Sequence, residues 1–157
     1  MSAYARIPGL MSRAAVTSAV TAATLAGTAL VPAATPEAEA LTPAGKALKV
    51  AASKKGAPYQ YGAAGPRRFD CSGLTQYSYK KAGKKLPRTA AAQYNRSKKI
   101  SATSRKKGDL VFFHSGGNVY HVGIYAGDGR IWHSPKPGKT VRKEKIWTKN
   151  VRYGRVR

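Results

Sequence analysis

The spacing of the hydrophobic residues changes once along the chain, near residue 110, and this change constrains the fold more than any other feature. Before residue 110, apolar residues recur three and four positions apart, as on one face of an α-helix. After residue 110 the period is two, as in strands that bury one face. Helices followed by strands predict an α+β domain, in which the N-terminal helices cover one face of an antiparallel sheet.

Three helices are expected before the change in period. The first begins at Thr42-Pro43, because Thr is a favoured N-cap and Pro fits the first helical position, and it ends at Lys54-Lys55-Gly56. The second runs from Cys71 to Ala82 with Asp70 as its N-cap. The third is short and runs from Ala90 to about Tyr94.

Five strands are expected after it, separated by turns rich in Gly and Pro. They cover Leu110–Phe113, Val119–Tyr125, Arg130–His133, Thr140–Ile146 and Val151–Val156.

The turn at Gly127-Asp128-Gly129 decides which residues share a face of the sheet. A three-residue loop pairs Ala126 with Arg130, and His121 and His133 then become diagonal neighbours on one face, roughly 7 to 8 Å apart at the backbone. A two-residue Asp-Gly turn would place the two histidines on opposite faces. We expect the three-residue loop.

The composition excludes several classes of protein. A single Cys rules out an internal disulfide framework and a Cys-based zinc finger. The chain is 42% hydrophobic, which is too apolar for a basic disordered tail. Its 29 Lys and Arg against six Asp and Glu give a net charge of +23, which suits an anionic partner.

Residues 1–40 resemble a secretory signal peptide. Arg6 and Arg13 precede an uncharged segment from Ala14 to Val31, and Ala38-Glu39-Ala40 is a small-x-small cleavage site. The alternative is a membrane anchor, but this Ala- and Thr-rich segment is at the short limit of a bilayer span. We expect cleavage after Ala40, no stable membrane insertion and a secreted domain of residues 41–157.

Export favours one kind of anionic partner over another. Residues 1–40 hold two Arg and two Glu, so the exported domain keeps the whole net charge of +23. An extracellular protein rarely meets nucleic acid, so we expect anionic cell-wall polymers as partners and no nucleic acid. The alternative is that the Lys pairs form only a solvated surface that keeps the protein soluble.

Cys71 is a candidate nucleophile. It lies in the first turn of an expected helix, where the helix dipole and free backbone N–H groups favour a thiolate and lower the thiol pKa from about 8.5. The alternative is an inert buried cysteine. An unpaired cysteine at a helix start in an exported protein favours the nucleophile.

A cysteine nucleophile needs a base and a group that orients the base. On the expected register, His121 is the general base for Cys71, and His133 holds the His121 ring through a hydrogen bond. Either histidine could instead simply fill a strand position. His114 lies beside a Ser-Gly-Gly turn and is expected to have no role. The histidine spacing and the single Cys argue against a zinc site, so we expect no metal ion.

Six segments together resemble, in order and spacing, the NlpC/p60 family of cell-wall peptidases over nearly all of residues 43–157. They are Tyr59-Gln60-Tyr61-Gly62, Phe69-Asp70-Cys71-Ser72-Gly73, Leu86-Pro87-Arg88-Thr89 with Gln93, Gly108-Asp109-Leu110-Val111-Phe112-Phe113, His121-Val122-Gly123-Ile124-Tyr125 and Ile131-Trp132-His133.

The resemblance implies a papain-like α+β fold and assigns roles to particular residues. The Cys-His-His catalytic set of the family falls on Cys71, His121 and His133. Tyr59 matches the family tyrosine near the oxyanion site. Asp70 and Ser72 match the residues that hold the free amino end of the substrate.

The implied activity is hydrolysis of peptide bonds in the peptidoglycan stem, commonly between γ-D-glutamyl and a diamino acid, and it needs no cofactor. We expect the protein to be a monomer. The loop Gly62-Ala63-Ala64-Gly65 departs from the usual Gly pair and continues into Arg67-Arg68, which affects the expected substrate preference. Two alternatives stay open. One is a related Cys-His amidase that cleaves between sugar and peptide, and the other is a non-enzymatic cationic wall-binding or antimicrobial protein.

Overall fold

Strand β2, Leu110–Ser115, lies at the centre of the fold. In this computed structural model, which describes residues 35–157, the side chains of Leu110 to Phe113 are fully buried. Leu110 and Phe112 face the helices, whereas Val111 and Phe113 belong to a second, smaller apolar cluster. Burial of alternate residues on opposite faces is what a strand with both faces covered requires.

Six antiparallel strands form one sheet in the order β1-β6-β2-β3-β4-β5. Besides β2, the strands are β1 Lys98–Ile100, β3 Asn118–Gly127, β4 Arg130–His133, β5 Arg142–Lys145 and β6 Val151–Arg155. All five expected strands are present, with ends that differ by one or two residues at most. The edge strand β1 was not expected, because its Lys98 and Lys99 are typical of a solvated loop; it pairs with β6.

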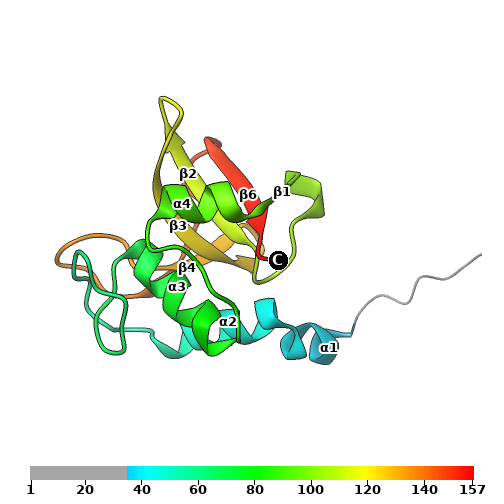
Figure 1. Ribbon diagram of the computed structural model, residues 1–157, viewed down its shortest axis with the longest axis horizontal. Helices are drawn as coiled ribbons and strands as arrows, with labels where there is room; N and C mark the ends of the chain where they lie inside the picture. The colour runs from blue at the N-terminus through cyan, green and yellow to red at the C-terminus, as the bar shows by residue number, and fades with distance from the viewer. Residues whose placement is uncertain (1–34) are drawn as a thin grey trace, which may run out of the picture. The chain divides into compact units, whose positions relative to one another are not determined.

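Helices α2 Pro43–Ser53, α3 Cys71–Lys81 and α4 Ala90–Arg96 cover one face of this sheet, which confirms the expected α+β architecture (Figure 1). A short helix, α1 Pro36–Leu41, precedes α2, and a 3-10 turn lies at Ala102–Ser104. The starts of α2, α3 and α4 are those expected, and for α2 and α3 the expected cap is also the observed one. Thr42 Oγ1, Asp70 Oδ1 and Thr89 Oγ1 accept hydrogen bonds from the N–H groups of Gly45, Gly73 and Ala92, at 3.0, 2.7 and 3.3 Å.

The β3–β4 hairpin differs from the expected loop but keeps the expected register. Asp128 and Gly129 form a two-residue turn with φ of 50° and 65°, typical of type I′, and Gly127 pairs with Arg130. The predicted pairing of Ala126 with Arg130 is therefore wrong. Ala126 is instead an extra residue in a β-bulge, so that Ile124 lies opposite Trp132, as the three-residue loop would have placed it.

The expected signal peptide lies mostly outside the described residues, and the part that is described includes most of α1. Cleavage after Ala40 would cut inside this helix, which has no buried residue. The cap of α2, Thr42, follows the cleavage point, so α2 keeps its own N-terminal stabilisation without α1. Within residues 35–157, no helix is long and apolar enough to span a bilayer.

Candidate active site

The N-terminus of α3 places Cys71 against strand β3. The backbone N–H groups of Val122 in β3, of Ser72 and of Cys71 itself lie close enough to the Cys71 sulfur to lower the thiol pKa. A hydrogen bond also joins the segment before Cys71 to the end of β4: Ser134 Oγ donates to the Phe69 carbonyl at 2.7 Å. Since His121 precedes Val122, the fold brings the expected nucleophile and the expected base to one place.

A chain of two hydrogen bonds runs from His121 to a carboxylate. His121 Nε2 lies 2.8 Å from His133 Nδ1, and His133 Nε2 lies 2.6 Å from Glu144 Oε2. His133 is 1% exposed, so its ring is held in place by these partners and by packing. The structure therefore brings together the two histidines that the sequence selected, and adds Glu144.

The carboxylate fixes which ring nitrogens carry hydrogen. Ionised Glu144 can only accept, so His133 Nε2 must donate to it. Neutral His133 then has a lone pair on Nδ1, which accepts from His121 Nε2–H. The nitrogen of His121 that remains unprotonated is Nδ1, and it is the only one left for Cys71.

The sequence did not indicate a role for Glu144, because it lies in the charged run Arg142-Lys143-Glu144-Lys145, which is typical of a solvated strand. The small number of acidic residues is a signal that could have identified it. After residue 40 the only ones are Asp70, Asp109, Asp128 and Glu144. Arg142 Nη2 holds the second carboxylate oxygen at 2.8 Å. Burial alone would raise the Glu144 pKa, but the hydrogen bonds from Arg142 and His133 lower it.

Burial keeps both Cys71 and His121 uncharged at neutral pH. It raises the pKa of the Cys71 thiol above its ordinary value, and the N–H groups of Val122 and Ser72 only partly oppose it. The expected lowering of the thiol pKa is therefore wrong, because desolvation outweighs the helix N-terminus. Burial, with His133 as a smaller cause, lowers the pKa of His121 to about 3.

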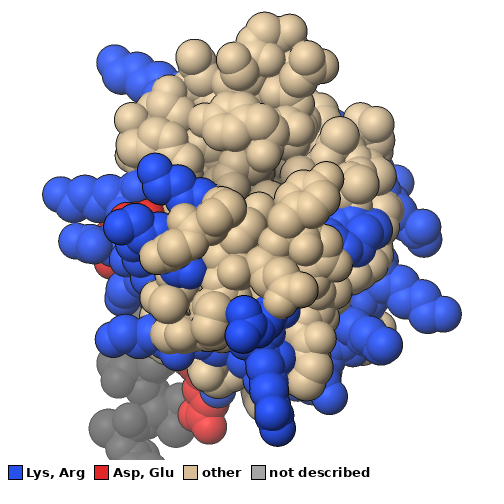
Figure 2. Space-filling view, turned by 90° about the vertical axis from the view of Figure 1, so that its left-hand side faces the viewer, with Lys and Arg blue, Asp and Glu red and all other residues tan. Residues whose placement is uncertain are grey.

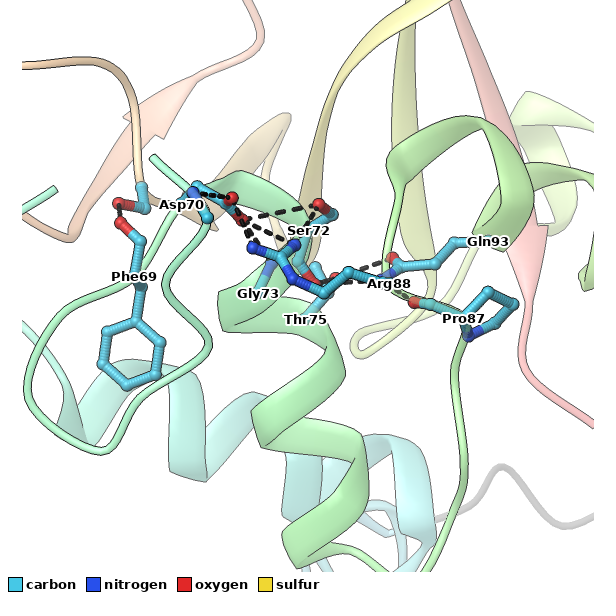
Figure 3. A network of polar contacts seen from close by, with 10 residues as sticks. Phe69, Asp70, Ser72, Gly73, Thr75, Pro87, Arg88 and Gln93 are labelled. Atoms are coloured by element: carbon cyan, nitrogen blue, oxygen red, sulfur yellow. Dashed lines mark hydrogen bonds and ion pairs between the residues drawn. The ribbon is translucent and has the colours of Figure 1, made fainter. Parts of the chain in front are cut away.

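Asp70 organises the segment beside Cys71 (Figure 3). Its carboxylate accepts from Arg88 Nη1 and Nη2 at 3.0 and 2.5 Å, and from the N–H groups of Gly62 and Gly73 at 2.9 and 2.7 Å. Arg88 Nη1 also donates to Ser72 Oγ at 3.0 Å. Burial alone would raise the pKa of Asp70, but these donors lower it, so the carboxylate is ionised.

Gln93 fixes the loop that carries Arg88. Its Nε2 donates to the carbonyl of Ser72 and to that of Pro87, both at 2.9 Å, and Thr75 Oγ1 donates to its Oε1 at 2.6 Å. Gln93 is fully buried, so α4 holds the Arg88 loop against α3. Arg88 and Gln93 belong to the expected family pattern, but their connection to Asp70 and Ser72 appears only in three dimensions.

Two cavities adjoin the Cys71–His121 pair. The cysteine cavity, about 400 Å³, is lined by Tyr59, Asp70, Cys71, Ser72 and Arg88 among others. The histidine cavity, about 570 Å³, is lined by His121, His133, Glu144, Trp147 and others. Tyr120 lines both, so it stands between them.

Of the other residues discussed from the sequence, Tyr59 lies in the site, whereas His114 and the Arg67-Arg68 pair lie outside it. Tyr59 lies in the cysteine cavity, and burial, followed by the nearby Cys71, raises its pKa. His114 lines a different cavity, with Lys149 and Arg152. Arg67 and Arg68 are exposed and line neither cavity. Within residues 35–157, no group of three or more His, Cys, Asp or Glu is placed to hold a metal ion.

Comparison with known proteins identifies related domains. The family model described as "NlpC/P60 family" matches residues 56–155. The probable endopeptidase p60 of Listeria monocytogenes is 44% identical over 114 residues, which are 68% of this chain and 23% of that protein. The bifunctional muramidase/DL-endopeptidase CwlT of Bacillus subtilis is 43% identical over 117 residues, 70% of this chain and 36% of that protein. The chain thus spans roughly a quarter to a third of these relatives.

A solved structure from Mycobacterium tuberculosis shows the same fold. RipD, described as a non-catalytic NlpC/p60 domain protein adapted to peptidoglycan binding, superposes with a TM-score of 0.64 at 28% identity, covering 73% of this chain and 98% of that one. A shared domain is therefore compatible with either catalysis or binding.

The pH dependence of alkylation shows whether the pKa of the Cys71 thiol is raised or lowered. Because burial favours the neutral thiol, the rate of reaction with iodoacetamide is expected to rise with pH through a midpoint above about 8.5, the value of an ordinary cysteine. Mass spectrometry of the intact protein follows the single thiol. A midpoint well below 8.5 would show that a thiolate is the resting state.

The tautomers can be read from the ¹⁵N chemical shifts of the histidine rings at pH 7. We expect Nε2–H, with Nδ1 unprotonated, for both His121 and His133. In Glu144→Leu, which removes the acceptor, His133 should populate both tautomers, whereas Glu144→Gln keeps an acceptor oxygen and should keep the pattern. An unchanged pattern in Glu144→Leu would contradict the assignment, and His114 is the internal reference.

Proposed function

The chain belongs to the NlpC/P60 family, and from this premise we propose that it is a secreted cysteine peptidase that hydrolyses peptide bonds in the peptidoglycan stem. The observation that carries the proposal is the position of Cys71 against the part of β3 that carries His121, a base whose tautomer is set by His133 and Glu144. The names of the relatives, endopeptidase p60 and DL-endopeptidase CwlT, support this class of substrate.

The proposed reaction begins from an uncharged thiol and an uncharged imidazole. As Cys71 Sγ attacks the carbonyl carbon, its proton moves to His121 Nδ1, and Glu144 stabilises the new imidazolium through His133. The oxyanion is held by the Cys71 N–H and the Tyr59 hydroxyl. His121 then gives the proton to the leaving amine as the C–N bond breaks, and water hydrolyses the thioester and restores the thiol.

The proposed acyl side of the substrate occupies the cysteine cavity. Its ionised Asp70 and the neighbouring Ser72 hydroxyl suit the free amino end of a stem peptide, as the family resemblance implies. Arg88 keeps that carboxylate charged and in position. With the amino end held there, the bond proposed for cleavage is the one between γ-D-glutamyl and the diamino acid.

The non-catalytic RipD makes binding without catalysis the relevant alternative. This chain has Cys71, His121 and His133, and the two histidine rings are hydrogen-bonded to each other with a carboxylate behind them. A domain that only bound peptidoglycan would have no need of this arrangement. A related amidase would use the same nucleophile on a different bond, so products must distinguish it.

The test is digestion of purified peptidoglycan by the protein, by Cys71→Ala and by His114→Ala, whose histidine lies outside the site. We expect new γ-D-glutamyl carboxyl ends, detected by mass spectrometry, with the protein and with His114→Ala, and a loss of at least about 10³-fold in Cys71→Ala. Free lactyl groups on the sugar would instead establish an amidase. Lysis that survives in Cys71→Ala would refute the enzyme.

We also propose that residues 1–40 are removed on secretion and that the basic surface then retains the domain on anionic wall polymer. On the face shown in Figure 2, Lys and Arg side chains project at the left, right and lower edges of a region of uncharged residues, and acidic side chains are few. Runs such as Arg105-Lys106-Lys107 supply part of the net positive charge of the chain. Such attraction is electrostatic and is screened by salt.

Retention on the wall can be measured directly. The domain, residues 41–157, is expected to sediment with isolated cell walls at about 0.15 M NaCl and to elute near 1 M, where the screening length falls to about 3 Å. Walls stripped of their anionic polymers are the control and should bind less. Elution already at 0.15 M would contradict wall retention.

A further inference from the structure

We propose that the histidine cavity binds the leaving segment of the substrate and that Lys136 and Lys145 select segments ending in a free carboxylate. This inference rests on the proposed peptidase function and adds the chemistry of the second half of its substrate. It follows from where the cavity lies, what forms its walls and which of its charges remain unpaired.

The position of the cavity follows from the proton transfers. The leaving amine must lie beside the base that protonates it, so the leaving segment lies on the His121 side of the thiol. His121 and His133 line the histidine cavity, whereas Cys71 and Asp70 line the cysteine cavity. A peptide that crosses the Cys71–His121 pair therefore passes Tyr120 from the cysteine cavity into the histidine cavity.

The walls of the histidine cavity carry unusual exposed aromatic surface. Trp147 is 51% exposed although its ring stacks on Phe113, with centroids 4.1 Å apart and planes at 13°. Tyr120 is 52% exposed. Within residues 35–157, these are two of the four large hydrophobic side chains that are exposed, and both line this cavity. Together with Pro135 they offer the aliphatic part of a diamino acid an apolar surface.

The charges in the cavity are unbalanced. Its carboxylate, Glu144, bonds His133 and is paired with Arg142, which balances its charge. Lys136 and Lys145 line the same cavity, and neither forms an ion pair within the part of the chain that the structure describes. Two cations without a partner favour an anion at the far end of the leaving segment.

The cavity has room for a short peptide. A cavity of about 570 Å³ lies within the range, roughly 300 to 1,000 Å³, of sites that bind small ligands. A dipeptide that starts with a diamino acid fits this description, with its side chain against Trp147 and its terminal carboxylate at the two lysines. The probe is therefore L-lysyl-D-alanine, and its C-terminal amide is the uncharged control.

The experiment measures binding of both dipeptides by calorimetry, to the protein and to two double variants. Lys136→Gln/Lys145→Gln removes the proposed carboxylate site. Lys80→Gln/Lys81→Gln removes the same charge from a separate cavity on α3 and is the matched control. We expect the carboxylate dipeptide to bind about tenfold more weakly to the first variant and unchanged to the second, and the amide to bind weakly to all three.

Two results would overturn the inference: equal binding of acid and amide to the protein, or equal losses in the two double variants. Parallel assays of peptidoglycan cleavage separate this inference from the proposed function. Thiol-dependent cleavage without carboxylate-selective binding refutes the cavity assignment alone. Selective binding without any cleavage refutes the peptidase and leaves the carboxylate site in place.

Discussion

The rest of the site depends on the hydrogen bonds that the Asp70 carboxylate accepts. It caps α3 through Gly73, fixes the preceding loop through Gly62 and receives the guanidinium of Arg88. Three segments that are separate in sequence are thereby joined at one ionised group, directly before Cys71. The nucleophile is positioned by the backbone of a capped helix, which is more rigid than a loop would be, and β3 needs only to present His121 to it.

In a chain with so few acidic residues, most of those in the domain have specific partners. Asp70 binds Arg88, Asp109 binds Arg155, and Glu144 binds both His133 and Arg142. Asp128 occupies the tip of a turn. The three paired carboxylates are placed where a charge must be compensated or a proton directed, and the remaining surface is left basic.

The helices and the candidate nucleophile could be predicted because their signals are local in the sequence. Features that depend on contacts between distant segments could not be predicted. Thr42 and Asp70 each cap a helix within three residues of themselves, so the sequence was sufficient to place these two helix starts. Glu144 meets His133 only through the pairing of β4 with β5. The pKa of Cys71 was predicted in the wrong direction because its helix position is visible in the sequence and its burial against β3 is not. The roles of Tyr59, Asp70 and Ser72 remain predictions, although all three line one cavity with Cys71.

The bulge at Ala126 separates the outer end of the β3–β4 hairpin from the part that carries the histidines. Ala126 lies unpaired between the pair Gly127–Arg130 at the turn and the pair Tyr125–Ile131 further inside the hairpin. The pairing at the turn therefore does not decide which side chains of the inner strands share a face. Gly129 is tied to the neighbouring chain, because its carbonyl accepts from the Ile146 N–H at 2.8 Å, whereas Asp128 is exposed. A reporter peptide inserted at Asp128 would therefore leave the spacing between the two imidazoles fixed by the inner pairs.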